Sequence, residues 1–427
     1  MTTLDELSQV LVRLQLVDPA LLSDCVHRVE SSRGGAAELL RMLEGRHLLT
    51  SYQVSRLERD ETDQLVLGEY KLMYRNASGS FARVFRAESI RDGRMIGIKV
   101  LRQRWAKDPK MVALFHREAE LGQKLQHEYI VPIYEIAQQG EIHYFTMEFV
   151  EGGNFRDFLN IRKKLSPVEA TRFTLQMAEG LEYALRMGLT HRDLKLTNVL
   201  MSSRGVAKLV DFGLAGDVAP DRASASETPQ RALEYAALEK GTNAPSHDPR
   251  SDLFFLGGIY YELLTGLPPF ARTRSRDERR DFARYTNVRS LKSIDPNIPR
   301  AVVDACERMM KVAPEQRYQS PTAVVTDLRQ ILAELDKNAV ASVLAGSENG
   351  SRESSRSRYS VMCIEHRLRQ QNLLRDYLNK HGYRVLMFND LQRGMKRLES
   401  DPPDCVLLMG ESIGDDVAGA FLMSSEL

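Results

Sequence analysis

The fold of this chain is decided by the stretch His191-Arg-Asp-Leu-Lys-Leu-Thr-Asn198, which is followed thirteen residues after its asparagine by Asp211-Phe-Gly213. Asp193 is suited to accept a proton from a hydroxyl group, and Lys195 can neutralise a phosphoryl group during transfer. Asn198 and Asp211 offer oxygen ligands of the kind that Mg²⁺ prefers. Each motif alone is compatible with a polar surface loop, but chance occurrence of both in this order and spacing is negligible.

A lysine and a glutamate upstream extend this candidate site. Lys99 lies in the apolar run Ile98-Lys-Val100, where an unpaired ammonium group is costly to bury. Glu118 stands nineteen residues later on an amphipathic helix, and an ion pair between the two would hold the ammonium against nucleotide phosphates. The alternative for these two residues in isolation is a surface lysine on an edge strand and a solvated glutamate.

The segment Ala77-Ser-Gly-Ser-Phe-Ala-Arg-Val84 lies in a predicted hairpin, where a glycine-rich loop can cover phosphates with its backbone N–H groups. Gly79 is the one glycine present of the three that such a loop usually has. By itself, this segment is therefore better interpreted as a plain β-turn.

The order of elements predicts a small β-rich lobe followed by a larger helical lobe, which is an α+β pattern. Between residues 70 and 150, β-rich runs at 83–87, 95–101 and 142–150 are separated by turn residues and by one amphipathic helix at 109–127. Residues 151–335 are mostly helical, with examples at 166–186 and 252–265. The first of these helices opens with a capping box and a proline at its first position.

With these motifs in this order, residues 70–335 resemble the eukaryotic-like Ser/Thr protein kinases, which have a bilobal fold. The resemblance implies transfer of the γ-phosphate of ATP to protein hydroxyls in bacterial signal transduction, with Mg²⁺ or Mn²⁺ as the metal. By this resemblance, Lys99 is the lysine that anchors ATP and Glu118 is its partner on the helix. Asp193 is the catalytic base and Lys195 is the lysine that binds phosphate. The two metal ligands are Asn198 and Asp211. It also implies an ATP pocket that includes Gly79, Val84, Met147 as gatekeeper, and a hinge from Glu148 to Val150.

Several positions depart from the kinase pattern. Ala77 and Ala82 replace two loop glycines, and Ala237-Leu-Glu239 stands where the family usually has Ala-Pro-Glu. Arg231-Ala232 stands where Gly-Thr is usual, and the threonine hydroxyl of the family helps to fix the catalytic aspartate and lysine. These losses leave a pseudokinase, an ATP-binding signalling scaffold, as the alternative function.

The resemblance carries further expectations about the helical lobe. Arg192 beside the catalytic base suggests an activation segment that is ordered by phosphorylation, although an unmodified serine-rich loop is an equal alternative. Arg317 is expected to pair with Glu239. The stretch 272–289, with seven arginines against three acids, is either a solvated insert or a guide for an acidic substrate. The candidate phosphosites are Ser224, Ser226 and Thr228.

Three further segments flank the kinase-like region. Residues 1–62 show helical periodicity, with an N-cap at Asp18-Pro19 and a capping box at Thr50-Ser-Tyr-Gln53. They resemble the helical leader of planctomycete kinases, and we expect them to act in docking or dimerisation. Residues 336–358 are predicted to be a disordered linker. Residues 359–427 have a βαβαβ pattern and resemble a truncated, degenerate response-regulator receiver, because Met409 stands at the phosphoacceptor position. The acidic pair of a receiver is reduced to Glu365 and His366. The segment is therefore interpreted either as an interaction module or as a vestigial tail without a function.

The composition limits the partners. The 427 residues carry 59 basic and 58 acidic side chains, so no overall field recruits nucleic acid or a membrane. The four cysteines form no metal-binding pairs, and neither a signal peptide nor a run of eighteen apolar residues is present. We therefore expect a cytoplasmic protein with protein substrates and signalling partners, and with a homodimer through the leader or the kinase lobes as an option.

Overall fold

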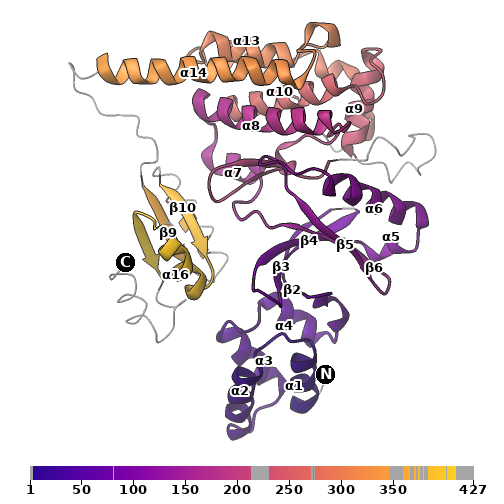
Figure 1. The fold of residues 1–427 in the computed structure, drawn as a ribbon, viewed down its shortest axis with the longest axis vertical. Helices are drawn as coiled ribbons and strands as arrows, with labels where there is room; N and C mark the ends of the chain where they lie inside the picture. Colours follow the sequence, from indigo (N-terminus) through magenta and orange to yellow (C-terminus); the bar gives the residue numbers. More distant parts are fainter. Residues whose placement is uncertain are drawn as a thin grey trace. The chain divides into compact units, whose positions relative to one another are not determined.

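The computed structural model describes residues 3–79, 81–212, 230–270, 273, 275–345 and, with short gaps, 359–409. The chain divides into two compact units (Figure 1). The first consists of Met1–Glu151 with Leu209–Ala219, and the second of Gly152–Lys208 with Pro220–Leu427. Each unit is described by itself.

The first unit begins with a bundle of helices that has its own apolar core. The core is built from leucines and valines such as Leu11, Val29 and Leu43, which are fully buried. The predicted N-cap at Asp18 and the capping box from Thr50 to Gln53 are both present. The prediction that these residues are helical is therefore confirmed, while their likeness to a planctomycete kinase leader stays a prediction. The helices are α1 (Leu4–Arg13), α2 (Pro19–Ser31), α3 (Ala36–Gly45) and α4 (Ser51–Glu58).

A six-stranded antiparallel sheet follows, in the order β1-β2-β3-β4-β6-β5. It matches the predicted β-rich runs. The predicted helix at 109–127 is present but ends at Gln123, with Gly122, a poor helix former, in its last turn. The elements are η1 (Thr62–Gln64), β1 (Val66–Leu67), β2 (Tyr70–Ser78), β3 (Ala82–Ser89), β4 (Met95–Leu101), α5 (Gln103–Ala106), α6 (Pro109–Gln123), β5 (Ile133–Gln139) and β6 (Ile142–Glu148).

The register of the sheet separates its two faces. Val84 lies opposite Lys99, while the neighbouring Arg83 lies opposite Val100. Because side chains alternate along a strand, Lys99 and Val100 belong to different faces. The face of Val100 carries an apolar core with Phe85, against which Tyr52 of α4 packs with a ring separation of 5.8 Å. The leader therefore covers the face of the sheet that Lys99 does not use.

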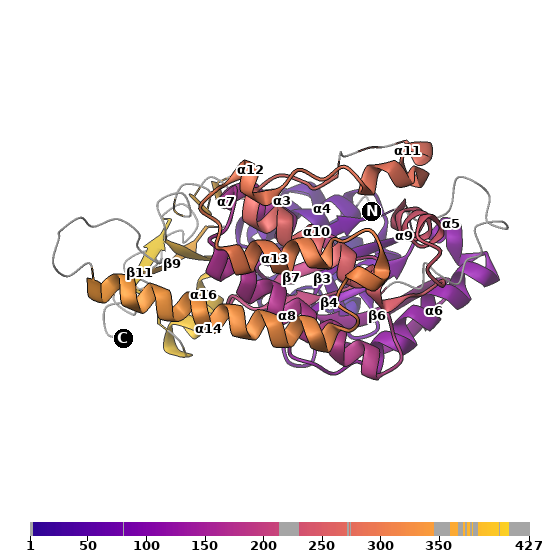
Figure 2. The same ribbon diagram turned by 90° about the horizontal axis from the view of Figure 1, so that it is seen from above.

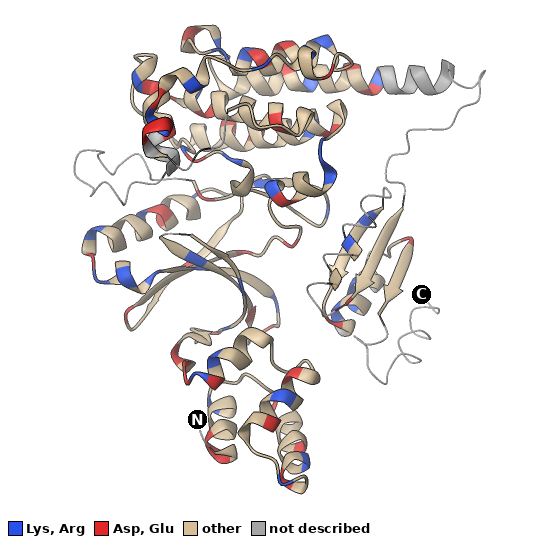
Figure 3. Ribbon diagram, turned by 180° about the vertical axis from the view of Figure 1, so that it is seen from behind, with Lys and Arg blue, Asp and Glu red and all other residues tan. Residues whose placement is uncertain are grey.

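The second unit is built around α10 (Pro249–Thr265), whose residues from Ser251 to Leu264 are all buried. Helices α8 and α13 pack on α10, and α14 packs on α8 (Figure 2). Both signs of charge are spread over these helices and over those of the leader (Figure 3). The remaining elements are α7 (Phe155–Arg162), α8 (Pro167–Arg186), η2 (Leu196–Asn198), β7 (Val199–Met201), β8 (Ala207–Leu209), α9 (Gln230–Gly241), α11 (Arg276–Arg280), η3 (Phe282–Tyr285), α12 (Leu291–Ile294), α13 (Arg300–Met309), η4 (Pro314–Gln316) and α14 (Pro321–Ala345).

Two predicted boundaries in this unit need correction. The helix expected at 252–265 begins three residues earlier, because Asp248 caps it and Pro249 occupies its first position. The linker expected from residue 336 does not begin there, because α14 continues to Ala345. Residues 336–345 contain neither glycine nor proline, and their alanines and leucine favour a helix.

The C-terminal segment forms a three-stranded parallel sheet in the order β10-β9-β11. This is the order in which a doubly wound sheet of the 2-1-3 type begins. Glu365, directly after the first strand, is buried, and Met409 directly follows the last strand. His366 and most of the helix expected at 367–381 lie outside the described residues. The elements are β9 (Ser360–Ile364), β10 (Arg384–Phe388), α16 (Leu391–Ser400) and β11 (Cys405–Leu408).

Candidate functional site

In the first unit, Lys99 bridges two carboxylates. Its Nζ atom lies 2.6 Å from Oε1 of Glu118 and 2.8 Å from Oδ1 of Asp211. The alternative of a surface lysine is wrong, because the Lys99 and Glu118 side chains are only 10% and 14% exposed. Burial alone would lower the pKa of Lys99, but the carboxylates of Asp211 and Glu118 raise it above its ordinary value. The ammonium therefore stays charged in a largely dry setting.

Strands β4 and β6 and helix α6 position Lys99 and Glu118. Strand β4 supplies Lys99, and its ammonium lies 5.6 Å from the centre of the Phe145 ring on β6. Helix α6 supplies Glu118, and Phe115 of the same helix packs against Phe145 at 5.2 Å. Asp211 has a positive φ of 60°, which aspartate tolerates better than most other residues.

The residues expected around the nucleotide lie on the same sheet. Val84 faces the same side as Lys99, and Met147 lies opposite Gly97, where an added Cβ would come within 3.1 Å of the Met147 side chain. Glu148 ends β6 and donates its N–H to the Pro132 carbonyl at 3.1 Å. The close approach at Gly97 explains why a glycine interrupts an apolar strand at this point. Val150, two residues beyond Glu148, is buried.

The glycine-rich segment is held by an arginine that sequence reasoning missed. Gly79 closes the β2–β3 turn by donating its N–H to the Ala82 carbonyl at 3.0 Å. The Arg102 Nε donates to the Gly79 carbonyl at 2.7 Å, and its Nη2 donates to Oγ of Ser78 at 2.8 Å. Arg102 follows the end of β4 and has no motif around it, so the sequence offered no signal for this contact.

In the second unit, a compact set of polar groups surrounds Asp193. Lys195 Nζ lies 2.7 Å from Asp193 Oδ2, and Asn198 Nδ2 donates to the same oxygen at 2.7 Å and to the Asp193 carbonyl at 3.0 Å. The amide nitrogen of Asn198 is thereby engaged, which leaves its amide oxygen as the group able to bind a cation. The sequence prediction that these three residues act together is consistent with this arrangement.

The backbone before Asp193 is fixed by Asp252 of α10. Its carboxylate accepts the N–H of His191 at 2.7 Å and the N–H of Arg192 at 2.9 Å. It also accepts the hydroxyl of Tyr235 at 2.8 Å. Arg192 has a φ of 60°, so the loop is held in a conformation that an unsupported chain rarely adopts. Asp252 therefore fixes the backbone that leads into Asp193.

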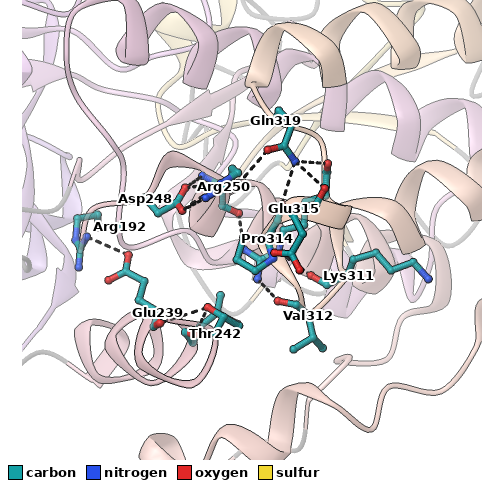
Figure 4. Close-up of polar contacts among 12 residues, drawn as sticks. Arg192, Glu239, Thr242, Asp248, Arg250, Lys311, Val312, Pro314, Glu315 and Gln319 are labelled. Carbon is teal, nitrogen blue, oxygen red and sulfur yellow. Dashed lines mark hydrogen bonds and ion pairs between the residues drawn. The ribbon is translucent and has the colours of Figure 1, made fainter. Parts of the chain in front are cut away.

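The predicted pair between Arg317 and Glu239 is wrong. Glu239 pairs with Arg192 at 3.3 Å (Figure 4), and burial raises the pKa of Glu239 against the influence of that arginine. Arg317 instead donates to the carbonyls of Lys311 at 2.6 Å, Val312 at 2.6 Å and Arg250 at 2.9 Å. Burial lowers the pKa of Arg317 to about 10. The physical reason is that carbonyls after α13 lack helical partners, and one guanidinium satisfies several of them.

The arginine-rich stretch at 272–289 is in part structural. Arg279 lies 2.7 Å and Arg284 3.6 Å from Oε1 of Glu234, and all three side chains are largely buried. For these two arginines, the expectation of a solvated insert is therefore wrong. Glu234 belongs to α9, which also contains Ala232, one of the two residues that stand where the kinase family usually has Gly-Thr. The candidate phosphosites Ser224, Ser226 and Thr228, together with Gly213, lie outside the described residues.

The donor set can be tested for its fit to a divalent cation. Asp211 offers a carboxylate that is 34% exposed, and Asn198 offers an amide oxygen. These are hard oxygen ligands, and Mg²⁺ is commonly held by one or two protein groups together with substrate phosphates. Across the described part of the chain, no group of three or more His, Cys, Asp or Glu residues forms a metal cage. Taken separately, each of the two donors is thus of the kind that suits a metal arriving with a nucleotide.

The fold and these two clusters define a protein of the kinase class, and sequence comparison agrees. Residues 75–328 match the family model of the protein kinase domain, which is more than half of the chain, so the chain belongs to this family. Among the helices that the structure describes, none combines the length and apolar character needed to cross a bilayer.

Similar proteins are bacterial serine/threonine-protein kinases. The chain is 30% identical over 293 residues to a probable serine/threonine-protein kinase of Streptomyces coelicolor, covering 66% of this chain and 43% of that protein. It is 27% identical over 264 residues to PrkC of Bacillus subtilis, covering 62% and 40%. It is 29% identical over 299 residues to PknB of Mycobacterium tuberculosis, covering 64% and 46%. The chain therefore spans less than half the length of these relatives.

Proposed function

We propose that this protein transfers the γ-phosphate of ATP to serine or threonine hydroxyls of proteins, as part of bacterial signal transduction. The observation that carries the proposal is the buried bridge from Lys99 to Glu118 and Asp211, because a charged lysine held in this way is poised for nucleotide phosphates. The similarity to bacterial serine/threonine-protein kinases supports the choice of protein hydroxyls as acceptors.

Each cluster has a separate task in this reaction. Lys99 orients the α- and β-phosphates, while Gly79 and Val84 cover the nucleotide and Met147, Glu148 and Val150 border its adenine. Asp193 orients the acceptor hydroxyl and receives its proton, and Lys195 neutralises the phosphoryl group. Asn198 and Asp211 would hold Mg²⁺, with Mn²⁺ as a substitute, and the metal when bound neutralises phosphate charge.

The flanking segments are proposed to act in protein contacts. The helical leader, of the planctomycete kinase type, and the parallel C-terminal sheet, a degenerate receiver-like segment, are assigned to docking or dimerisation. Met409 stands where a receiver carries its phosphoacceptor aspartate, so the C-terminal sheet has no group there to form an acyl phosphate. We place the protein in the cytoplasm, with protein rather than nucleic-acid or membrane partners.

A pseudokinase that acts as an ATP-binding signalling scaffold is the second candidate function. It is favoured by Ala232, which has no hydroxyl to offer the catalytic loop and lies within helix α9. It is also favoured by Ala77, which replaces a glycine of the phosphate-covering loop. The cluster of Asp193, Lys195 and Asn198 argues against it, because a scaffold that only binds ATP needs no group to receive a hydroxyl proton.

The test is transfer of labelled γ-phosphate from Mg-ATP by the full chain, to itself and to a generic basic protein. Asp193→Asn removes the proposed base, and Asp92→Asn, the same substitution at a turn of the sheet, is the matched control. We expect transfer that Asp92→Asn retains and Asp193→Asn loses by about a thousandfold. Absence of transfer in Mg²⁺ and Mn²⁺, with ATP still raising the melting temperature, would establish the scaffold instead.

A further inference from the structure

A cavity of about 520 Å³ lies in the first unit, on the side of the sheet that faces the leader. It is bordered by η1, by strands β3 and β4, and by the turn between β5 and β6. Arg83 and Phe85 line it from β3, and Val100 lines it from β4. These residues share the face opposite to that of Lys99, so the cavity is separate from the nucleotide cluster.

Arginines dominate the charge of this cavity. Arg83, Arg102 and Arg104 all line it. The Nε of Arg83 is buried without a hydrogen-bond partner among the described residues, which is a costly state for a guanidinium donor. Burial lowers the pKa of Arg102, and the nearby charges of Arg83, Arg104 and Arg75 lower it further. Clustered guanidinium groups of this kind are stabilised when an anion binds among them.

The acidic residues of the cavity lining compensate the charge of Arg83 and Arg102 only weakly. Its two acidic lining residues, Asp63 and Glu141, are both exposed to solvent, where their fields are screened. Within the described residues, neither of them forms an ion pair with Arg83 or Arg102. A bound anion would therefore meet the half-buried side chains of Arg83 and Arg102, while the carboxylates of the lining are screened by solvent.

The rest of the lining combines an apolar wall with three glutamines, Gln64, Gln103 and Gln139. Phe85, Val100, Leu101 and Ile142 contribute the wall, and the volume falls within the range of small-ligand sites. Guanidinium groups bind phosphate in a bidentate manner, and an apolar wall favours a carbon body attached to it. A phosphomonoester with an apolar body matches both features.

We propose that this cavity is a binding site for phosphomonoesters, either a free organic phosphate or a phosphorylated side chain. Arg83 and Arg102 bind the phosphate, and Phe85 contacts the attached carbon group. Arg102 is also the residue that donates to Gly79 and Ser78. A ligand that recruits Arg102 competes with those two hydrogen bonds, so binding here loosens the turn that contains Gly79.

The chain contains a built-in probe for this site. Trp105 is its single tryptophan, and the guanidinium of Arg104 lies 5.1 Å from the Trp105 ring. Titration of the full chain with phenyl phosphate, in the presence of saturating non-hydrolysable ATP analogue, should change tryptophan fluorescence in a saturable way. Phenol, which lacks the phosphate, should not. Absence of a saturable change would overturn the proposal.

Variants locate the binding site. Arg83→Gln should weaken phenyl phosphate binding at least tenfold, and Arg83→Lys, which keeps the charge but not the fork, should weaken it less. Arg91→Gln, at an exposed turn of the same sheet, is the matched control and should bind normally. Equal affinity in all of them would refute the assignment. Because Lys99→Met should leave this binding intact, failure of the proposed kinase activity and failure of this site are distinguishable.

Two further arms decide the source of the phosphate and its effect. If a peptide with phosphoserine beside leucine binds at least tenfold more tightly than phenyl phosphate, the ligand is a phosphorylated side chain. If phenyl phosphate binds at least tenfold more tightly than the peptide, the ligand is a free organic phosphate. Binding should also speed amide exchange of the peptide around Gly79, because Arg102 is withdrawn. Unchanged exchange at full occupancy would overturn the proposed link between the cavity and the glycine-rich segment.

Discussion

Glu239 is expected to couple energetically to Arg192 and not to Arg317. The Arg192 Nη1 and Glu239 Oε1 atoms lie 3.3 Å apart, and the two side chains are only 8% and 6% exposed. Removing one member of a buried ion pair leaves an uncompensated charge and costs about 3–5 kcal/mol. Glutamine can still accept a hydrogen bond from the guanidinium, so Glu239→Gln should lie at the lower end, at about 3 kcal/mol.

Native-state hydrogen exchange of the full chain, measured on peptides from α9 and α10, reports the opening free energy of this region alone. A loss of about 3 kcal/mol corresponds to roughly 150-fold faster exchange. Glu334→Gln, the same substitution at an exposed position of α14, should leave the exchange rates nearly unchanged. The control separates the loss of a buried pair from any general effect of removing a carboxylate.

A double-mutant cycle identifies the partner. Glu239→Gln combined with Arg192→Met should show a coupling energy above about 1 kcal/mol, because the two side chains are in contact. Glu239→Gln combined with Arg317→Lys should be additive within about 0.5 kcal/mol. Additivity with Arg192, or coupling to Arg317 of comparable size, would refute the reasoning from the buried pair.

Burial lowers the pKa of His143 from 6.5, so below about pH 6.5 the unfolded chain takes up a proton that the folded chain does not. The free energy of unfolding of the protein should therefore fall by up to about 1.4 kcal/mol for each pH unit of acidification. Urea titrations followed by tryptophan fluorescence measure this slope, and His143→Gln should make it smaller. Thr50→Ala removes a helix cap and a 2.7 Å hydrogen bond to β2, so the same titration should show a loss of about 2 kcal/mol in the free energy of unfolding. Thr3→Ala removes only a helix cap and should cost about 1 kcal/mol. Equal losses would mean that the bond to β2 contributes nothing. Cys405 is exposed while Cys306 is buried with a raised pKa, so mass spectrometry should find a thiol reagent on Cys405 first; earlier labelling of Cys306 would contradict its burial.

Sequence reasoning succeeded where the signal is local. The capping box that begins with Ser166 starts α8 at Pro167, as predicted, because the groups that satisfy the first N–H donors of a helix are close in sequence. The spacing between Lys99 and Glu118 predicted a contact that the structure contains. That success depended on a long-range pattern shared by a whole family, since nothing in the two residues alone favours burial over exposure.

Sequence reasoning failed where several groups compete for one partner. Arg192 and Arg317 are both buried arginines, and the sequence cannot show which of them reaches Glu239. The outcome depends on the uncapped carbonyls after α13, which occupy one guanidinium and leave the other for the carboxylate. The contact between Arg102 and Gly79 was missed for the same reason, because a side chain that binds a backbone carbonyl leaves no pattern in the sequence.

The packing of the leader changes what can be expected of it. Helix α4 places Tyr52 against Phe85, and Thr50 donates to the Met73 carbonyl of β2, so this helix covers the apolar face of the sheet. A dimer formed through the packed side of α4 would have to expose that face of the sheet, and a second copy would need to replace the lost burial of apolar area. Val12 of α1 and Leu21 of α2 are instead nearly half exposed. A homodimer that uses α1 and α2 would therefore leave the sheet covered.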